Sequence, residues 1–152
     1  MGKRPILASS CAAASSAAEA RYRIDRPIEE TRRTTVIALD GGAAKINARA
    51  ARSASERVRF VTAASPTACG ETRPLVEDSD LVILVATSEL QSSTASSLGR
   101  VCENTGVPVF GLVVGRPLER ASAVSALRGQ TNMLVASETP SDLADILSDL
   151  RA

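Results

Sequence analysis

The chain has 152 residues, of which 44% are hydrophobic and only 2% aromatic, so we expect a single domain with an aliphatic core. Its net charge is +1, yet residues 1–60 hold twelve Lys/Arg against six Asp/Glu, whereas residues 61–152 hold six against eleven. This separation suits charged protein partners or contact between copies, while the scarcity of aromatic rings excludes most base-stacking nucleic-acid binders.

The absence of His and the three Cys further restrict the chemistry. Without His, acid–base catalysis at neutral pH would need a perturbed carboxylate or Lys, which disfavours most hydrolytic enzymes. Cys11, Cys69 and Cys102 match no metal-binding spacing, and their odd number predicts a reducing compartment, the cytoplasm. The longest apolar run, Leu81–Ala86, is far shorter than the ~20 residues of a membrane span, so no integral membrane segment is predicted.

Residues 1–33 are predicted to form a flexible N-terminal tail or docking segment. Residues 1–19 are rich in Ser and Ala and show no periodicity. Residues 21–33 are strongly charged, with apolar side chains only at Tyr22, Ile24 and Ile28, so this stretch can pack along the domain edge or dock on a partner.

The remaining residues, 34–152, alternate between strand-like and helix-like segments. Strands are expected at 34–40, 57–63, 80–86, 107–114 and 132–136, and helices at 43–54, 90–106, 119–129 and from an N-cap at Ser141 onwards. Between the second and third strands, residues 65–80 are predicted to be a loop with one helical turn. This order predicts an α/β, Rossmann-like, doubly wound and mostly parallel five-stranded sheet with helices on both faces.

In such sheets a ligand lies at the carboxyl ends of the strands, so the loops there contain the candidate site. Gly41 and Gly42 follow the first strand and precede a helix, which is how many phosphate-binding loops begin. No complete G-x-G-x-x-G or P-loop motif is present, and Asp40 would repel a phosphate, so a simple tight turn is the competing interpretation.

A second candidate is the hydroxyl-rich stretch from Thr87 to Ser97, which follows the most apolar strand. Ser92, Ser93 and Thr94 could bind a phosphate or a sugar near a helix start, but they also suit an ordinary helix N-terminus with a polar face. Cys69 could be exposed in a loop, whereas Cys102 is expected to be buried, and inert thiols are the favoured interpretation of both. Asp40, Asp78, Asp80 and Glu89 do not form a convincing metal site, because Asp78 and Asp80 precede a strand.

The order of these pieces resembles the nucleotide-binding domain of the tubulin-like bacterial division GTPases, the FtsZ family. The resemblance covers about residues 34–137 and rests on five stretches: VIALDGGAAKINARA, RVRFVTAASP, DSDLVILVATSE, TGVPVFGLVVGRPLE and VSALRGQTNMLVA. It implies that Gly41, Gly42, Ala43 and Asn47 in one loop and helix, and Ser92, Ser93 and Thr94 in another, line a nucleotide site.

This sequence departs from the family at the residues that the GTPase needs. The glycine- and threonine-rich signature loop is replaced by SELQSSTASS, residues 88–97, which contains no glycine. Ala44, Ala64, Ser65 and Pro66 stand where the family has polar nucleotide contacts, and the second domain that completes GTP hydrolysis has no counterpart.

The resemblance therefore implies a non-catalytic relative with at most a remnant nucleotide site and no cofactor. The expected function is an interaction or assembly module that binds a protein partner or itself, as a homo-oligomer or a subunit of a larger complex. The alternatives are a nucleotide- or dinucleotide-binding domain and an accessory subunit of an enzyme complex.

Overall fold

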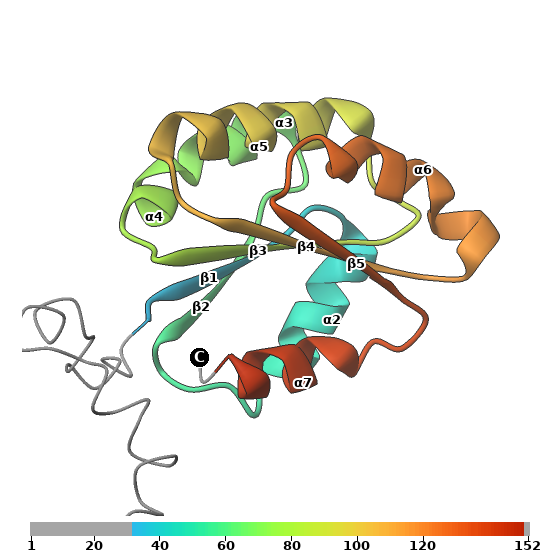
Figure 1. The fold of residues 1–152 in the computed structure, drawn as a ribbon, viewed down its shortest axis with the longest axis horizontal. Helices are drawn as coiled ribbons and strands as arrows, with labels where there is room; N and C mark the ends of the chain where they lie inside the picture. Colours follow the sequence, from blue (N-terminus) through green and yellow to red (C-terminus); the bar gives the residue numbers. More distant parts are fainter. Residues whose placement is uncertain (1–31, 151–152) are drawn as a thin grey trace, which may run out of the picture.

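Five short segments rich in β-branched and aliphatic residues form one parallel sheet in the computed structural model, which describes residues 32–150 (Figure 1). The strands are β1 (Thr34–Ala38), β2 (Val58–Thr62), β3 (Leu81–Ala86), β4 (Val109–Val114) and β5 (Met133–Ser137). They lie in the order β2-β1-β3-β4-β5, and every neighbouring pair is parallel. This is the flavodoxin-like version of the doubly wound fold, so the predicted five-stranded α/β sheet is confirmed.

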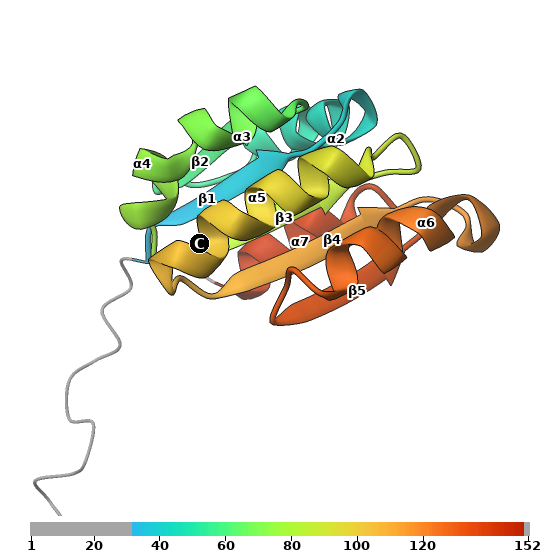
Figure 2. The same ribbon diagram turned by 90° about the horizontal axis from the view of Figure 1, so that it is seen from above.

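Helices cover both faces of this sheet (Figures 1 and 2). One face is covered by α2 (Gly41–Ala51) and α7 (Asp142–Asp149), and the other by α3 (Pro66–Glu71), α4 (Arg73–Glu77), α5 (Ser92–Thr105) and α6 (Pro117–Arg128). Each face has its own cluster of buried apolar side chains. None of the helices in this part of the chain has both the length and the hydropathy of a membrane-spanning segment.

The central strand β3 explains why its sequence is apolar without interruption. Successive side chains point to opposite faces, so Val82 and Leu84 join the cluster under α5, while Ile83 and Val85 join the cluster under α2 and α7. All four side chains are completely buried. A strand covered on both faces has no position where a polar side chain would reach water.

The helix boundaries follow local capping chemistry. The predicted C-terminal glycine of α5 is confirmed, because Gly106 has the left-handed φ of 68° that favours glycine. The helix α6 begins at Pro117, two residues earlier than predicted, and Pro suits this first position because its missing N–H needs no partner there. Lys45 and Arg49 of α2 and Arg52, its C-cap, are exposed, as the helical spacing predicts.

The prediction of a loop over residues 65–80 is wrong, since two short helices, α3 and α4, occupy most of it. The Ser65 hydroxyl accepts a hydrogen bond from the Ala68 N–H at 3.2 Å, and Pro66 fills the first helical position. In α4, which begins at Arg73, Pro74 occupies the second helical position. Hydrophobic periodicity is too weak to reveal helices of five or six residues, whereas the caps indicate their starts.

At the amino edge of the sheet, two arginines converge on Asp78. The Arg59 guanidinium donates to Asp78 Oδ2 at 2.8 Å, and that of Arg33 donates to Oδ1 at 2.5 Å. The Arg33 N–H also donates to Asp80 Oδ2, at 2.9 Å. The hydrogen bond from Arg59, followed by the charge of Arg33, lowers the pKa of Asp78 below its ordinary value.

This lowered pKa predicts a component of acid destabilisation that depends on Asp78. A carboxyl group whose pKa is lower in the folded chain stabilises the fold above its unfolded pKa, near pH ~4, and this stabilisation is lost as the pH falls through the folded pKa. The Asp78→Asn variant should therefore lose less stability than the wild type between about pH 5 and pH 2, in urea unfolding followed by circular dichroism. Glu77→Gln, which changes the exposed carboxylate next to Asp78, is the control. If Asp78→Asn and the wild type lost the same free energy of unfolding on acidification, the prediction would be contradicted.

Candidate functional site at the carboxyl edge of the sheet

The carboxyl ends of β1 and β3 bring Asp40 and Thr87 together. The Leu39 N–H donates to the Val85 carbonyl at 2.9 Å, which extends the pairing of the two strands to their ends. Asp40 Oδ2 accepts from the Thr87 N–H at 2.7 Å, and Oδ1 accepts from the Thr87 hydroxyl at 2.8 Å. Asp40 is only 5% exposed, so its carboxylate serves as a buried clamp between two strand ends.

The same carboxylate begins the first helix. Asp40 Oδ1 accepts a hydrogen bond from the Ala43 N–H at 2.7 Å, which makes Asp40 the N-cap of α2. Glu89, from the loop after β3, reaches across and accepts from the Gly42 N–H at 3.0 Å. Two of the first N–H groups of α2 are thus bonded to carboxylates of the chain itself.

The two glycines are explained by these neighbours. A Cβ atom on Gly42 would lie 2.8 Å from Thr87 Oγ1 and 3.0 Å from Thr87 Cγ2, which is too close. A Cβ atom on Gly41 would lie 3.4 Å from Glu89 Oε2, an ordinary contact distance. Neither residue has a positive φ. Gly42 is therefore required by the close approach of Thr87, which gives it a structural reason that needs no phosphate.

The seven residues predicted to bind a nucleotide have different environments. Gly41, Gly42 and Ala43 form the first turn of α2, beside Glu89 and Asp40. Ser92 and Ser93 are exposed in the first turn of α5.

The other two predicted residues face the interior. Asn47 is 4% exposed on the buried side of α2, and its Nδ2 lies at 3.5 Å from the Val36 carbonyl oxygen. Thr94 is fully buried, and its hydroxyl has no hydrogen-bond partner among the described residues. Contact of any of the seven with a ligand stays a prediction. The carboxylates of Asp40 and Glu89 at the start of α2 disfavour an anion beside them.

Sequence reasoning named Asp40, Thr87 and Glu89 but missed that they interact. It treated Asp40 as a group that repels a phosphate and Glu89 as part of an unconvincing metal site, whereas in the structure both carboxylates accept hydrogen bonds from the first turn of α2. The local signal was available for Asp40, because an Asp three residues before the Ala43 N–H is a typical N-cap. The contribution of Glu89 had no such signal, since 47 positions separate it from Gly42.

The described cysteines are free and sheltered. Cys69 lies on α3 and is completely buried, so the expectation that it could be exposed in a loop is wrong. Burial raises the pKa of Cys69, and burial together with the charge of Cys69 raises the pKa of Cys102 to about 11. Thiols of this kind are poor nucleophiles at neutral pH. Residues 32–150 also contain no group of three or more His, Cys, Asp or Glu placed to hold a metal ion.

Comparison with known proteins adds the fold of a solved neighbour. Neither the protein-family models nor the curated proteins match this sequence. A pilus assembly-related protein of Burkholderia pseudomallei has a similar structure, with a TM-score of 0.50 and 14% identity over 84% of this chain and 94% of that one. The receiver domain of a Francisella response regulator aligns with a TM-score of 0.44 and 13% identity, over 78% of this chain and 95% of that one.

The resemblance to the FtsZ family is wrong. A solved structure that shares the fold over 84% of this chain is described as a pilus assembly-related protein and not as a tubulin-like GTPase. The predicted role as a tubulin-like assembly module is therefore wrong as well, and the alternatives of a nucleotide-binding domain and an accessory enzyme subunit find no support in this neighbour. The stretches that suggested the family are strands and the turns and helices next to them, in the order that doubly wound domains of unrelated function share. The chain therefore has a flavodoxin-like fold, shared with the Burkholderia protein.

Proposed function

We propose that this chain is a flavodoxin-like domain that acts by contacting another protein and performs no chemistry at the carboxyl edge of its sheet. The observation that supports this most directly is the closed N-terminus of α2, where Asp40 and Glu89 accept hydrogen bonds from Ala43 and Gly42. In this fold a substrate or cofactor would bind at that edge. With the Gly42 and Ala43 N–H groups bonded to carboxylates and the Ala44 N–H bonded to the Asp40 carbonyl, the start of α2 offers a phosphate few amides and places two carboxylates beside it.

The chemistry of the described residues supports the same proposal. The chain has no His, and the two described thiols are buried with raised pKa values. Asp40 could act as a phosphoryl acceptor only by giving up its hydrogen bonds to Thr87 and Ala43. The free state of Cys69 and Cys102 supports a reducing compartment, such as the cytoplasm, as part of this proposal.

The proposal is tested first by asking whether the edge reacts or binds. The full chain is incubated with acetyl phosphate and Mg²⁺, and its mass is measured by mass spectrometry. In a second experiment its melting temperature is measured with and without GTP, ATP or NAD. We expect neither a phosphoryl mass gain nor a thermal shift. A ligand at 100 times its Kd would add about 2.7 kcal/mol of stability, so a clear shift or a stable phosphoryl adduct would overturn the proposal.

The second arm asks for a protein partner. The Burkholderia protein of similar fold is related to pilus assembly, so the components of a pilus-assembly apparatus are the first candidates for this chain. Each purified component is titrated against the full chain by calorimetry, and sedimentation of the chain alone shows whether it is a monomer or a homo-oligomer. Saturable binding of one component supports the proposal, whereas a chain that binds none of them and sediments as a monomer contradicts it.

A further inference from the structure

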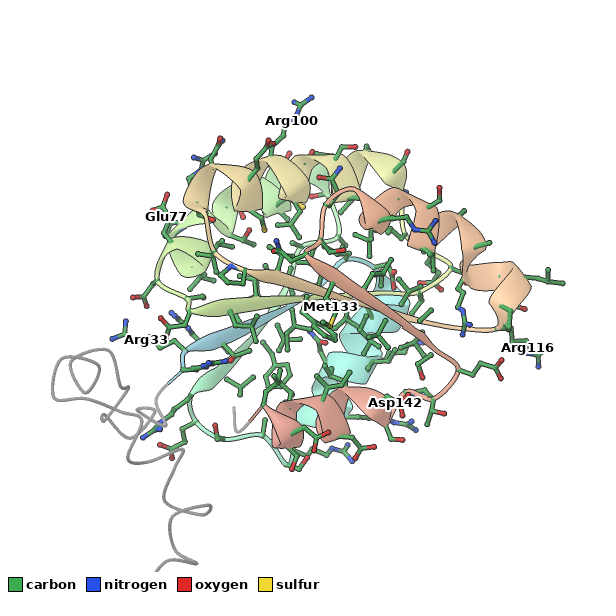
Figure 3. All side chains as sticks on the ribbon, viewed as in Figure 1. Arg33, Glu77, Arg100, Arg116, Met133 and Asp142 are labelled. Atoms are coloured by element: carbon green, nitrogen blue, oxygen red, sulfur yellow. The ribbon has the colours of Figure 1, made fainter. Side chains whose placement is uncertain are left out.

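An apolar surface lies at the amino end of the edge strand β5. Met133, the first residue of β5, is 59% exposed, and among residues 32–150 only Leu118 is another large apolar side chain with high exposure. Met133 is in register with Phe110 of β4, so the two side chains lie on the same face of the sheet. Figure 3 labels Met133 on β5 and Asp142 at the start of α7.

The apolar surface continues along β5 and onto α7. Val135 follows Met133 by two residues and shares its face. Ile146 and Leu150 are four residues apart, at the spacing that places side chains on one side of a helix. Phe110, Val135, Ile146 and Leu150 are each only partly buried against the cluster under α2 and α7. We call these residues the β5–α7 patch: Phe110, Met133, Val135, Ile146 and Leu150.

The helix that borders the β5–α7 patch is acidic on its exposed side. Asp145 and Asp149 adjoin Ile146 and Leu150, and the sequence has no Lys or Arg between Arg128 and Arg151. The other two carboxylates of this stretch, Glu138 and Asp142, lie at the carboxyl edge of the sheet, away from Met133. Asp145 and Asp149 are exposed on α7, and none of the salt bridges in the described part of the chain involves them. An occupant that covers the apolar side chains and carries positive charge would therefore be attracted to this surface.

A segment of the same chain has this composition. Residues 21–28, RYRIDRPI, combine the apolar side chains of Tyr22, Ile24 and Ile28 with three Arg and a single Asp. The described chain begins with Arg32 and Arg33 at the amino end of β1, which is the same edge of the sheet as Met133, because all strands are parallel.

The distance along that edge is within reach. From β1 to β5 there are three strand spacings, which amount to ~14 Å. The ten residues from Ile24 to Thr34 can span up to ~33 Å. A tether of this length also holds the segment at a local concentration of about millimolar, which favours it over a second copy at ordinary protein concentrations.

We propose that residues 21–28 dock in cis on the β5–α7 patch. Tyr22 and Ile24 cover Met133 and Phe110, and the arginines of the segment face Asp145 and Asp149. The inference is independent of the proposed function, since it concerns the amino edge of the sheet and the proposed function concerns the carboxyl edge. It gives residues 21–28 a defined binding site on the fold.

The composition of the chain supplies a selective probe. Tyr22 is the only Tyr, there is no Trp, and Met133 is one of only two Met. Acrylamide quenching of tyrosine fluorescence therefore reports on residue 22 alone, and methyl-labelled Met gives two NMR signals. We expect a nuclear Overhauser effect between the Tyr22 ring and the Met133 methyl group in the full-length chain.

Two matched variants test the contact by fluorescence. Because a docked ring is shielded from solvent, Met133→Glu should raise the quenching constant of Tyr22 by about twofold or more. Leu118→Glu changes the other exposed apolar side chain, at the start of α6, and should leave the constant unchanged. Asp145→Asn with Asp149→Asn should raise it as well, through the loss of attraction to the arginines.

Three results would overturn the proposal. One is the absence of the Tyr22–Met133 effect together with equal quenching in the wild type and Met133→Glu. Another is equal quenching of Tyr22 in the full chain and in a peptide of residues 1–31. The third is loss of the protection on about a hundredfold dilution, because a contact in cis does not depend on concentration and a contact with a second copy does.

Discussion

Replacement of Asp40 with Ala is expected to lower the free energy of unfolding by about 3 kcal/mol, the sum of a lost N-cap and a part-buried amide left without a partner. The cap is the bond from the Ala43 N–H to Asp40 Oδ1, at 2.7 Å. The amide is the Thr87 N–H, which donates to Oδ2 at 2.7 Å and would lose its acceptor. Urea unfolding followed by circular dichroism measures the loss.

The Asp40→Asn variant separates the two contributions. Asn caps helices about as well as Asp, so the bond from Ala43 can persist. If its amide oxygen accepts from the Ala43 N–H, its NH₂ group faces the Thr87 N–H, and two donors then meet without an acceptor. We expect the free energy of unfolding of Asp40→Asn to lie between those of the wild type and Asp40→Ala. As a control, the Ser65→Ala variant removes the exposed N-cap of α3 and should lower the free energy of unfolding by about 1 kcal/mol. An equally small loss for Asp40→Ala would contradict the role of Asp40 as a clamp between the two strand ends.

The Gly42→Ala variant is expected to lose about 1–3 kcal/mol, even though Ala is the better helix former. The new Cβ atom would lie 2.8 Å from Thr87 Oγ1 and 3.0 Å from Thr87 Cγ2. Thr87 cannot easily yield, because its hydroxyl and its N–H are both bonded to Asp40. Unfolding free energies of the single and double variants measure the effect.

The decisive control for Gly42 is a rescue. With Thr87→Ala in place, Gly42→Ala should cost nothing or stabilise the chain by up to about 1 kcal/mol, since the clash is gone and helix propensity remains. The Gly99→Ala variant offers a contrast. Its Cβ would meet Gln130 Oε1 at 1.7 Å, but this is the end of a flexible side chain, so we expect a small cost. A Gly42→Ala cost that persists beside Thr87→Ala would mean that Thr87 is not the reason for the glycine.

These experiments also bear on the proposed function. If Asp40, Thr87 and Glu89 hold the edge closed, their replacement changes stability and exposes the N–H groups at the start of α2. Any anion binding that appears only in Asp40→Ala or Glu89→Ala would show that the carboxylates occupy a place which a ligand could otherwise take. The wild-type chain is expected to show none.

Much of the fold follows directly from the sequence. The uninterrupted apolar run of β3, the C-terminal glycine of α5 and the exposed face of α2 are all as predicted, because each depends on neighbours within a few residues. The two short helices α3 and α4 were missed for the opposite reason, since a helix of five or six residues is too short to show a period.

The candidate site shows where local reasoning stops. The glycines after β1 suggested a phosphate loop because glycine permits a close approach, but the sequence does not say what approaches. The structure supplies Thr87 and Glu89, which lie 45 and 47 positions further along the chain than Gly42 and reach it only because β1 and β3 are adjacent. Because local segments do not reveal such long-range contacts, the order of strands, turns and helices also suggested a GTPase family, whereas a solved structure of similar fold is a pilus assembly-related protein.

The sequence by itself determined the alternation of strands and helices and the parallel sheet, because hydrophobic periodicity and capping residues act over short distances. Only the tertiary structure decided that the strands follow the order β2-β1-β3-β4-β5 and that Asp40 and Glu89 close the N-terminus of α2. It also decided that Met133 is exposed at the edge while Cys69 is buried. Strand order and burial depend on contacts between residues far apart in sequence, and a single sequence carries no local signal for such contacts.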